Sequence, residues 1–211
     1  MSSGKTQIIS VAMPLYVLGK NPASRILLIC LSDEAAKERV TSIKSYIESD
    51  PDYHAVFPHI KPGAKQEWTK HKLFIERDTY AKDASINSNG ITSSSIIGAR
   101  CDLLLVDDIF DQRTAVSQPA TREQYLTTYR QVCLSRVEPN GSVIAICTRW
   151  HELDLAGHIM ADPGMMRRYA VLVQRVADDF SGLECEVHVP DKYKFLYQKE
   201  CGEFFTSKAG Y

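Results

Sequence analysis

The sequence lacks a long hydrophobic run and an excess of charge of either sign, and each absence excludes a class of protein. The longest uninterrupted hydrophobic run spans residues 26–31, far short of the roughly 18–20 residues that a membrane-spanning helix needs. The chain holds 25 Lys and Arg against 26 Asp and Glu, a net charge of −1. A globally basic nucleic-acid-binding protein is therefore excluded, and any contact with DNA has to be a local patch.

Neither a disulfide framework nor a cleavable leader is expected from the sequence. Its six cysteines are scattered without a C-x-x-C pair, and several lie inside apolar runs; this favours reduced, buried thiols over disulfides. Residues 8–18 superficially resemble the apolar part of a secretory signal, but Pro14 interrupts them and no small-residue cleavage site follows. With 44% hydrophobic residues, the 211-residue chain can bury a core, and this argues against disorder and a fibrous repeat.

Strand-like and helix-like segments alternate along the chain. Apolar runs predict strands at residues 25–31, 73–77, 102–106 and 141–148. Helices are expected at residues 34–48, after a capping sequence that begins at Ser32, and at 121–135, before a turn at 138–141. This alternation predicts an α/β domain with a mostly parallel sheet flanked by helices. In such folds the chemistry lies beyond the carboxyl ends of the strands.

The first candidate site is the sequence Ser3-Gly4-Lys5-Thr6, directly before a helix-like run. It matches the second half of the phosphate-binding pattern G-x-x-x-x-G-K-[ST]. In that pattern Gly lets backbone amides approach phosphate, Lys reaches the β- and γ-phosphates, and the Thr hydroxyl binds Mg²⁺. The first Gly of the pattern would precede residue 1, so a chance match is the alternative.

The other candidates follow two of the predicted strands. Asp107 and Asp108 end the strand at 102–106; in a nucleotide site the first can serve Mg²⁺ and the second can orient the attacking water. The alternative is a strand that ends in a solvated turn. Thr148 ends the next strand and is placed to sense a γ-phosphate. The following His151-Glu152 does not continue as H-E-x-x-H, because Leu155 replaces the second His, so a zinc site is not expected.

Together these segments resemble the large terminase subunits of tailed bacteriophages, the motors that package viral DNA. The resemblance rests on GKT at 4–6, RILLICLSDEAAKERV at 25–40, HAVFP at 54–58, GARCDLLLVDDIFD at 98–111, TRWHELDLAGHIM at 148–160 and ECGEFFTSKAGY at 200–211. The sequence T-R-W-H-E-x-D-L-A-G, directly after a strand, is the most specific of these and corresponds to the family's ATPase coupling motif.

The resemblance implies a P-loop NTPase core with ATP and Mg²⁺ as cofactors. Ser3, Gly4, Lys5 and Thr6 would bind phosphate, and Thr6 and Asp107 would bind Mg²⁺. Asp108 and Thr148 would act in hydrolysis and its coupling. Arg100 would act on a neighbouring subunit's nucleotide as an arginine finger, with a surface arginine as the alternative.

The resemblance also implies partners and a location: double-stranded DNA, a portal, a small terminase subunit and a homo-oligomeric ring, in the cytoplasm of a bacterial host and without a membrane. Residues 1–176 would form the ATPase domain and 177–211 an extension towards a nuclease domain. The first half of the phosphate loop and its leading strand are not in the sequence, so we expect a sheet without its central strand and weak ATPase activity of these 211 residues alone.

Two other functions are open. A helicase-class motor shares the phosphate loop and the acidic strand end, and a non-catalytic remnant would only dock to a partner. Among the other residues, Arg149 is expected to support the loop around Thr148, and Trp68 and Trp150 to be buried anchors more readily than platforms for DNA bases. Lesser arginine candidates are Arg113, Arg122 and Arg136. Residues 87–90 and 93–95 suit a flexible loop near DNA or ordinary turns.

Overall fold

The computed structural model describes residues 4–63, 67–78, 82–176 and 183–188. The chain divides into two compact units, Met1–Leu155 and Ala156–Tyr211. The helical elements are η1 (Gln7–Ala12), α1 (Met13–Lys20), α2 (Asp33–Ser49), α3 (Pro51–Val56), η2 (Ser94–Gly98), η3 (Arg113–Ser117), α4 (Pro119–Thr128), η4 (Tyr129–Cys133), η5 (Leu134–Arg136), α5 (Leu155–Ala161) and α6 (Pro163–Met166). The strands are β1 (Ile26–Cys30), β2 (Lys72–Leu73), β3 (Ile86–Gly90), β4 (Cys101–Asp107), β5 (Val137–Ile146), β6 (Val171–Val176) and β7 (Leu183–His188).

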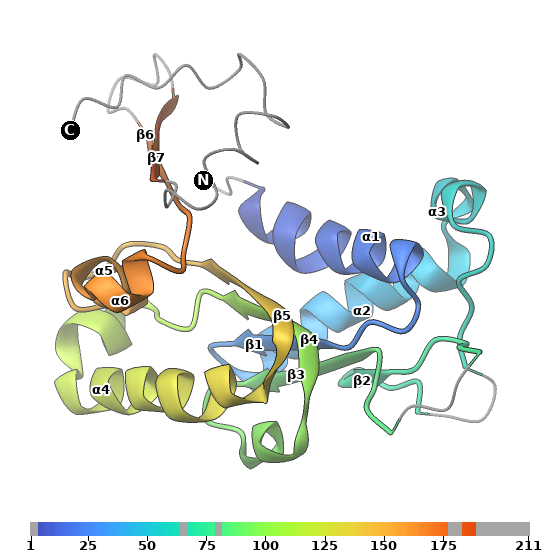
Figure 1. The fold of residues 1–211 in the computed structure, drawn as a ribbon, viewed down its shortest axis with the longest axis horizontal. Coiled ribbons are helices and arrows are strands. Elements are labelled where there is room, and N and C mark those ends of the chain that lie inside the picture. Colours follow the sequence, from blue (N-terminus) through green and yellow to red (C-terminus); the bar gives the residue numbers. More distant parts are fainter. Residues whose placement is uncertain (1–3, 64–66, 79–81, 177–182, 189–211) are drawn as a thin grey trace. The chain divides into compact units, whose positions relative to one another are not determined.

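The first unit is built on a five-stranded sheet in the order β2-β3-β1-β4-β5. Strand β1 pairs in parallel with both β3 and β4, and β4 pairs in parallel with β5. Only the two-residue β2 runs antiparallel to its neighbour, β3. The expected α/β fold with a mostly parallel sheet flanked by helices is therefore confirmed (Figure 1).

On one face of the sheet, alternate strand residues pack against α1 and α2 and form the hydrophobic core. Ile26 and Leu28 of β1 pack in the same cluster as Leu15 of α1 and Val40 of α2. Helix α2 starts there because the Ser32 side chain accepts a hydrogen bond from the Ala35 amide at 3.2 Å. Figure 1 shows α4 on the opposite side of the sheet from α1 and α2, so the sheet is covered on both faces, as its continuous apolar strands require.

The predicted strands at 25–31, 102–106 and 141–148 and both predicted helices are confirmed in kind, whereas the strand predicted at 73–77 is wrong beyond Leu73, the last residue of β2. Two further local errors concern predicted turns. Residues 87–90, interpreted as a loop or turn, belong to β3, which inserts beside β1 and is mostly buried. Residues 138–141, predicted as a turn, lie inside β5, where the register moves two residues along β4 and five along β5. The turn-forming sequence therefore makes a bulge within the strand.

The expected gap at the centre of the sheet is also wrong. In the described residues β1 occupies the centre and the ladder is unbroken from β2 to β5. Strand β5 lies at one edge of this sheet, and its apolar Val143, Ile144 and Ala145 are only half-buried.

The second unit contains α6 and an antiparallel pair, β6 and β7. Asp162 starts α6, because its carboxylate accepts hydrogen bonds from the amides of Gly164 at 2.7 Å and Met165 at 3.2 Å. The predicted extension at 177–211 lies outside the described residues except for β7, and the division at residue 176 stays a prediction. None of the described helices combines the length and apolar composition that a membrane crossing requires.

Candidate functional site at the carboxyl edge of the sheet

The parallel strands of the first unit end level with one another. Cys30 of β1 lies opposite both Gly90 of β3 and Asp107 of β4, and Asp107 lies opposite Ile146 of β5. The residues that follow these positions therefore share one edge of the sheet. Asp108 and Thr148 are among them, and this edge is where parallel α/β sheets bind their ligands.

The Gly4-Lys5-Thr6 segment starts a helix at this edge. Gly4 has φ of +70°, in the left-handed region that glycine adopts without a steric penalty. Its carbonyl accepts a hydrogen bond from the Ile8 amide at 3.0 Å, and helical structure runs from Lys5 through η1 and α1 to Lys20. The first amides of a helix have no partner within it and favour anions. Ser3 lies outside the described residues.

Thr6 and Asp107 contact each other across 101 positions of the sequence. The Thr6 hydroxyl donates a hydrogen bond to Asp107 Oδ1 at 3.4 Å. Asp107 is buried, with 3% of the residue exposed. The two residues predicted to share one Mg²⁺ ion therefore place their oxygens side by side.

A third residue, Arg39 of α2, completes this cluster. Its Nε atom donates to Asp107 Oδ2 at 3.2 Å, and its Nη1 lies 3.4 Å from the exposed carboxylate of Glu38. A buried carboxylate needs a positive partner, and Arg39 supplies one. Sequence reasoning missed Arg39, because a charged side chain in an amphipathic helix reads as part of its solvated face.

Asp108 is joined to Thr148 by two hydrogen bonds. Asp108 Oδ1 accepts from the Thr148 amide at 2.6 Å, and Oδ2 accepts from the Thr148 hydroxyl at 3.1 Å. Asp108 is the one described residue other than glycine with a positive φ, at 45°; such strained backbone is concentrated at functional sites. The structure thus brings together the two residues predicted to act in hydrolysis and its coupling.

The charge of Lys5 acts on the same group of residues. Burial raises the pKa of the Cys147 thiol to about 12, the charges of Asp108 and Asp154 add to this effect, and the charge of Lys5 opposes it. The Lys5 ammonium therefore lies within electrostatic range of the residue directly before Thr148. Cys30, Cys101 and Cys133 are buried free thiols, and Cys147 is half-buried and free, as the sequence predicted for these four.

The loop after Thr148 is organised by a buried carboxylate that the sequence analysis did not single out. Asp154, 1% exposed, accepts hydrogen bonds from the amides of Trp150 at 3.0 Å and His151 at 3.1 Å. Arg149 Nε lies 3.6 Å from the same carboxylate oxygen, which agrees with its expected supporting role. Trp150 is 41% exposed, so the expectation of a buried anchor is wrong for it.

Arg100 lies at the other end of the parallel strands, next to the amino end of β4. It precedes β4, which rises about 3.3 Å per residue, so it is roughly 20 Å from Asp107. Its side chain is 69% exposed and reaches Glu138 at 3.5 Å. Arg100 thus cannot contact the Asp107 and Asp108 carboxylates of its own chain.

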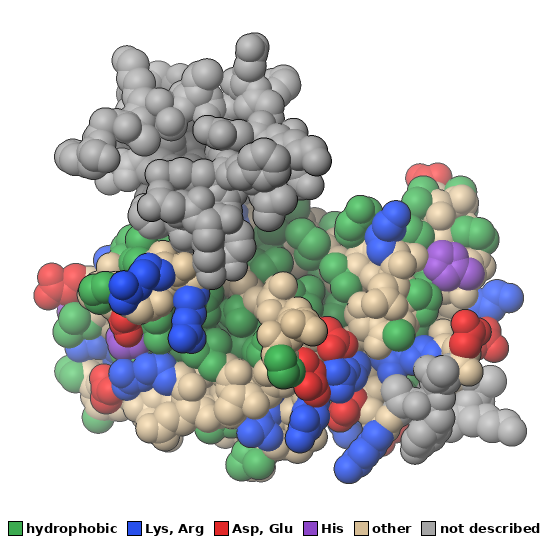
Figure 2. Space-filling model, viewed as in Figure 1, with side chains coloured by type: hydrophobic (Ala, Val, Ile, Leu, Met, Phe, Trp, Pro, Cys, Tyr) green, Lys and Arg blue, Asp and Glu red, His purple; other side chains and the backbone are tan. Residues whose placement is uncertain are grey.

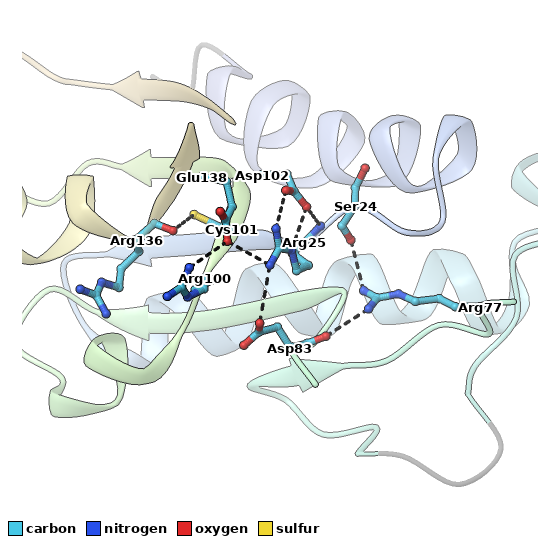
Figure 3. Close-up of polar contacts among 9 residues, drawn as sticks. All are labelled: Ser24, Arg25, Arg77, Asp83, Arg100, Cys101, Asp102, Arg136 and Glu138. Carbon is cyan, nitrogen blue, oxygen red and sulfur yellow. Dashed lines mark hydrogen bonds and ion pairs between the residues drawn. The ribbon is translucent and has the colours of Figure 1, made fainter. Parts of the chain in front are cut away.

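Glu138 connects Arg100 to an ionic network at the amino ends of β1 and β4 (Figure 3). In its centre Arg25 binds Asp102, with Nη2–Oδ1 of 2.7 Å and Nε–Oδ2 of 3.0 Å. These hydrogen bonds lower the pKa of Asp102 and raise that of Arg25. Arg77 donates to Ser85 Oγ at 2.8 Å nearby. The network fastens strands and loops and is remote from the carboxyl edge.

The remaining candidates are held by local contacts. The buried Arg122 donates to the Ala115 carbonyl, and Arg136 donates to the Ile97 carbonyl. Trp68 is half-buried and donates to Glu48 at 2.6 Å, in line with a packing role. Arg113 is exposed. On the face shown in Figure 2, basic and acidic side chains are interspersed.

An open pocket of about 620 Å³ includes Gln7, the residue after Thr6, in its lining. Its other lining residues come from α2 and the start of α3, and hydroxyl groups are frequent among them: Thr41, Ser42, Ser45, Tyr46, Ser49, Asp50 and Pro51. The described residues contain no group of three or more His, Cys, Asp and Glu side chains that could hold a metal ion by itself. Any ion at Thr6 and Asp107 would need ligands from a bound molecule or water.

Comparison of the sequence with protein-family models and with curated proteins gave no match.

Proposed function

We propose that the first unit is a P-loop ATPase core whose site lies between Gly4-Lys5-Thr6 and the ends of β4 and β5. The observation that carries the proposal is the Thr6–Asp107 contact at 3.4 Å. A chance GKT triplet has no reason to lie beside a buried carboxylate 101 residues away. The Asp108–Thr148 pair at the same edge supports the proposal independently.

The oxygens present fit a magnesium ion. Adjacent ligands of an octahedral Mg²⁺ lie about 3 Å apart, since each is about 2.1 Å from the ion; Thr6 Oγ1 and Asp107 Oδ1 are 3.4 Å apart. Mg²⁺ keeps waters and phosphate oxygens as its other ligands, so one hydroxyl and one carboxylate suffice from the protein. When bound, the ion would neutralise charge on the β- and γ-phosphates.

The protein side chains divide the remaining work. Lys5 and the first amides of the helix bind phosphate oxygens. Asp108 accepts a hydrogen bond from the attacking water and orients it towards the γ-phosphate. Thr148 holds both carboxylate oxygens of Asp108, so a movement of the loop at 148–154 changes the aim of that carboxylate. Hydrolysis and loop movement are thereby linked.

The specific motor that we propose is the ATPase of a terminase large subunit, which translocates double-stranded DNA into a procapsid. Its support is the sequence T-R-W-H-E-x-D-L-A-G after β5 and the order of the motifs at successive strand ends. A helicase-class motor would separate the strands of a duplex, whereas a packaging motor moves along it intact. A docking remnant would bind no ATP.

Calorimetric titration of the chain with Mg-ATP tests the proposal, with Lys5→Ala and Lys20→Ala as a matched pair. Lys5 begins the helix and the exposed Lys20 ends it, so the two variants remove the same charge from opposite ends. Lys5→Ala should weaken binding by roughly tenfold or more, since a charged hydrogen bond contributes about 1.5–3 kcal/mol. Lys20→Ala should bind as wild type. Equal affinities in all three proteins, or no binding at millimolar ATP, would contradict the proposal.

A further inference from the structure

The Asp107 carboxylate has a different partner on each oxygen. Oδ1 accepts from the Thr6 hydroxyl at 3.4 Å, and Oδ2 accepts from Arg39 Nε at 3.2 Å. The Asp107 side chain is 2% exposed, whereas that of Arg39 is 28% exposed. The guanidinium therefore stands between a buried anion and solvent, on the group that the proposed function assigns to Mg²⁺.

Arg39 has a second carboxylate within reach. Its Nη1 donates to Glu38 Oε2 at 3.4 Å, and the Glu38 side chain is 74% exposed. Both residues lie on α2, whose Val40, Ile43 and Ile47 are buried, so the helix that carries them is fixed. One guanidinium is thus shared between a buried acceptor, Asp107, and an exposed one, Glu38.

We propose that Arg39 is an internal counter-cation that competes with the divalent metal for Asp107. Without metal, Arg39 neutralises the buried carboxylate. A dication at Thr6 and Asp107 repels the guanidinium across a poorly screened site, and Arg39 moves towards Glu38 and solvent. This inference rests on the proposed function, and it assigns Arg39 a positioning role, since the residue acts through Asp107.

The charges around Arg39 are those that such an exchange requires. Burial raises the pKa of the Cys30 thiol to about 12; the charges of Asp107, Asp108 and Glu38 act in the same direction, and that of Arg39 opposes them. Three carboxylates and one guanidinium therefore act electrostatically on the end of β1. The carboxylates outnumber the guanidinium among these charges, and this favours a further cation.

The competition predicts opposite effects for two neighbouring substitutions. Arg39→Gln removes the competing charge and keeps a hydrogen-bond donor, so the site should bind metal on the order of tenfold more tightly. Glu38→Gln removes the exposed acceptor and commits Arg39 to Asp107, so metal binding should weaken. The control Lys37→Gln removes a charge from the same helix, at a side chain that lies 3.7 Å from Glu34, and should leave metal affinity near that of wild type.

The experiment is a titration with Mn²⁺, followed by the electron paramagnetic resonance signal of the free ion, on the full chain without nucleotide. Asp107→Asn, which should lose the binding, identifies the site. Tighter binding by Arg39→Gln with weaker binding by Glu38→Gln supports the inference. Equal affinities of these two variants and wild type overturn the inference and leave the proposed function standing. If no protein binds Mn²⁺ without nucleotide, the inference fails, and the ATP titration decides the proposed function separately. Glu38 is exposed, so Glu38→Gln should fold. Its metal affinity therefore still tests the inference if Arg39→Gln does not fold.

Discussion

The carboxylate of Asp108 accepts hydrogen bonds from both the amide and the hydroxyl of Thr148, 40 residues later in the chain. The ends of β4 and β5 are adjacent in the sheet, so this pair closes the gap between two strand ends. Asp108 holds the arrangement with a left-handed backbone at φ of 45°. Strain of this kind costs on the order of 1–3 kcal/mol and persists because the two hydrogen bonds fix the residue. The pair is the element through which the loop after β5 reaches the proposed catalytic carboxylate.

Thr148→Val removes the hydroxyl bond to Asp108 and keeps the amide bond and the side-chain shape. We expect single-turnover ATP hydrolysis to slow on the order of tenfold, because a hydrogen bond to a charged group contributes about 1.5–3 kcal/mol. Thr148→Ser keeps the hydroxyl and should hydrolyse ATP nearly as wild type does. If valine and serine variants react at the same rate as the parent, Thr148 only ends a strand.

Asp108→Asn should retain ATP binding and lose hydrolysis by roughly 10²–10⁴-fold, since an amide is a poor general base. Asn also tolerates a left-handed backbone, so the variant keeps the local structure. Parallel calorimetry and single-turnover hydrolysis separate the two effects. Normal turnover in Asp108→Asn would place the catalytic carboxylate elsewhere, with Glu152 as the next candidate.

Asp154→Ala should destabilise the first unit by about 1–3 kcal/mol, because it leaves the amides of Trp150 and His151 without this acceptor. Asp154→Asn keeps one carbonyl oxygen and should cost less. Urea unfolding followed by circular dichroism measures both. A stability equal to that of wild type in the alanine variant would show that the buried carboxylate does not organise the loop.

Asp102 gives a pH dependence whose sign follows from its lowered pKa. Hydrogen bonds from Arg25 lower that pKa, so the stabilisation is present above the ordinary value of about 4 and is lost as pH falls through the folded-state value. The difference in unfolding free energy between wild type and Asp102→Asn should therefore shrink below about pH 4. The exposed Glu34→Gln serves as a control. A difference that stays constant from pH 7 to acid would contradict the role of this ion pair.

Much of the fold was predictable because buried parallel strands carry continuous apolar runs. The apolar segments at 25–31, 102–106 and 141–148 predicted β1, β4 and β5, and Ser32 predicted the start of α2. Strand β3 was missed because its sequence, INSNG, is polar; its Asn89 is buried through hydrogen bonds with Asn87, Ser93 and Ser95. Local composition does not reveal that a buried polar side chain has its hydrogen-bonding groups satisfied.

The motif residues of the candidate site could be predicted from the sequence, but the residues that contact them could not. The strand-end rule brought Asp107, Asp108 and Thr148 to one edge, and Thr6 joins them. Arg39 and Asp154 were missed because the first reads as part of the solvated face of a helix and the second as an ordinary polar residue before one. Only the three-dimensional contacts reveal their interactions. Those contacts depend on strand order, which the sequence alone did not define.

The central claim is that Thr6 and Asp107 hold one metal ion for bound ATP, and the most direct test is the gain in ATP affinity that Mg²⁺ confers. This gain is measured by calorimetry with Mg²⁺ and with chelator, in wild type, Thr6→Val, Asp107→Asn and the double variant, each checked for folding by circular dichroism. Residues that act on one ion are not additive. We therefore predict that each single variant loses most of the gain and that the double variant loses little more. The claim would be contradicted if both single variants kept the gain in ATP affinity. It would also be contradicted if the loss in the double variant were the sum of the losses in the two single variants.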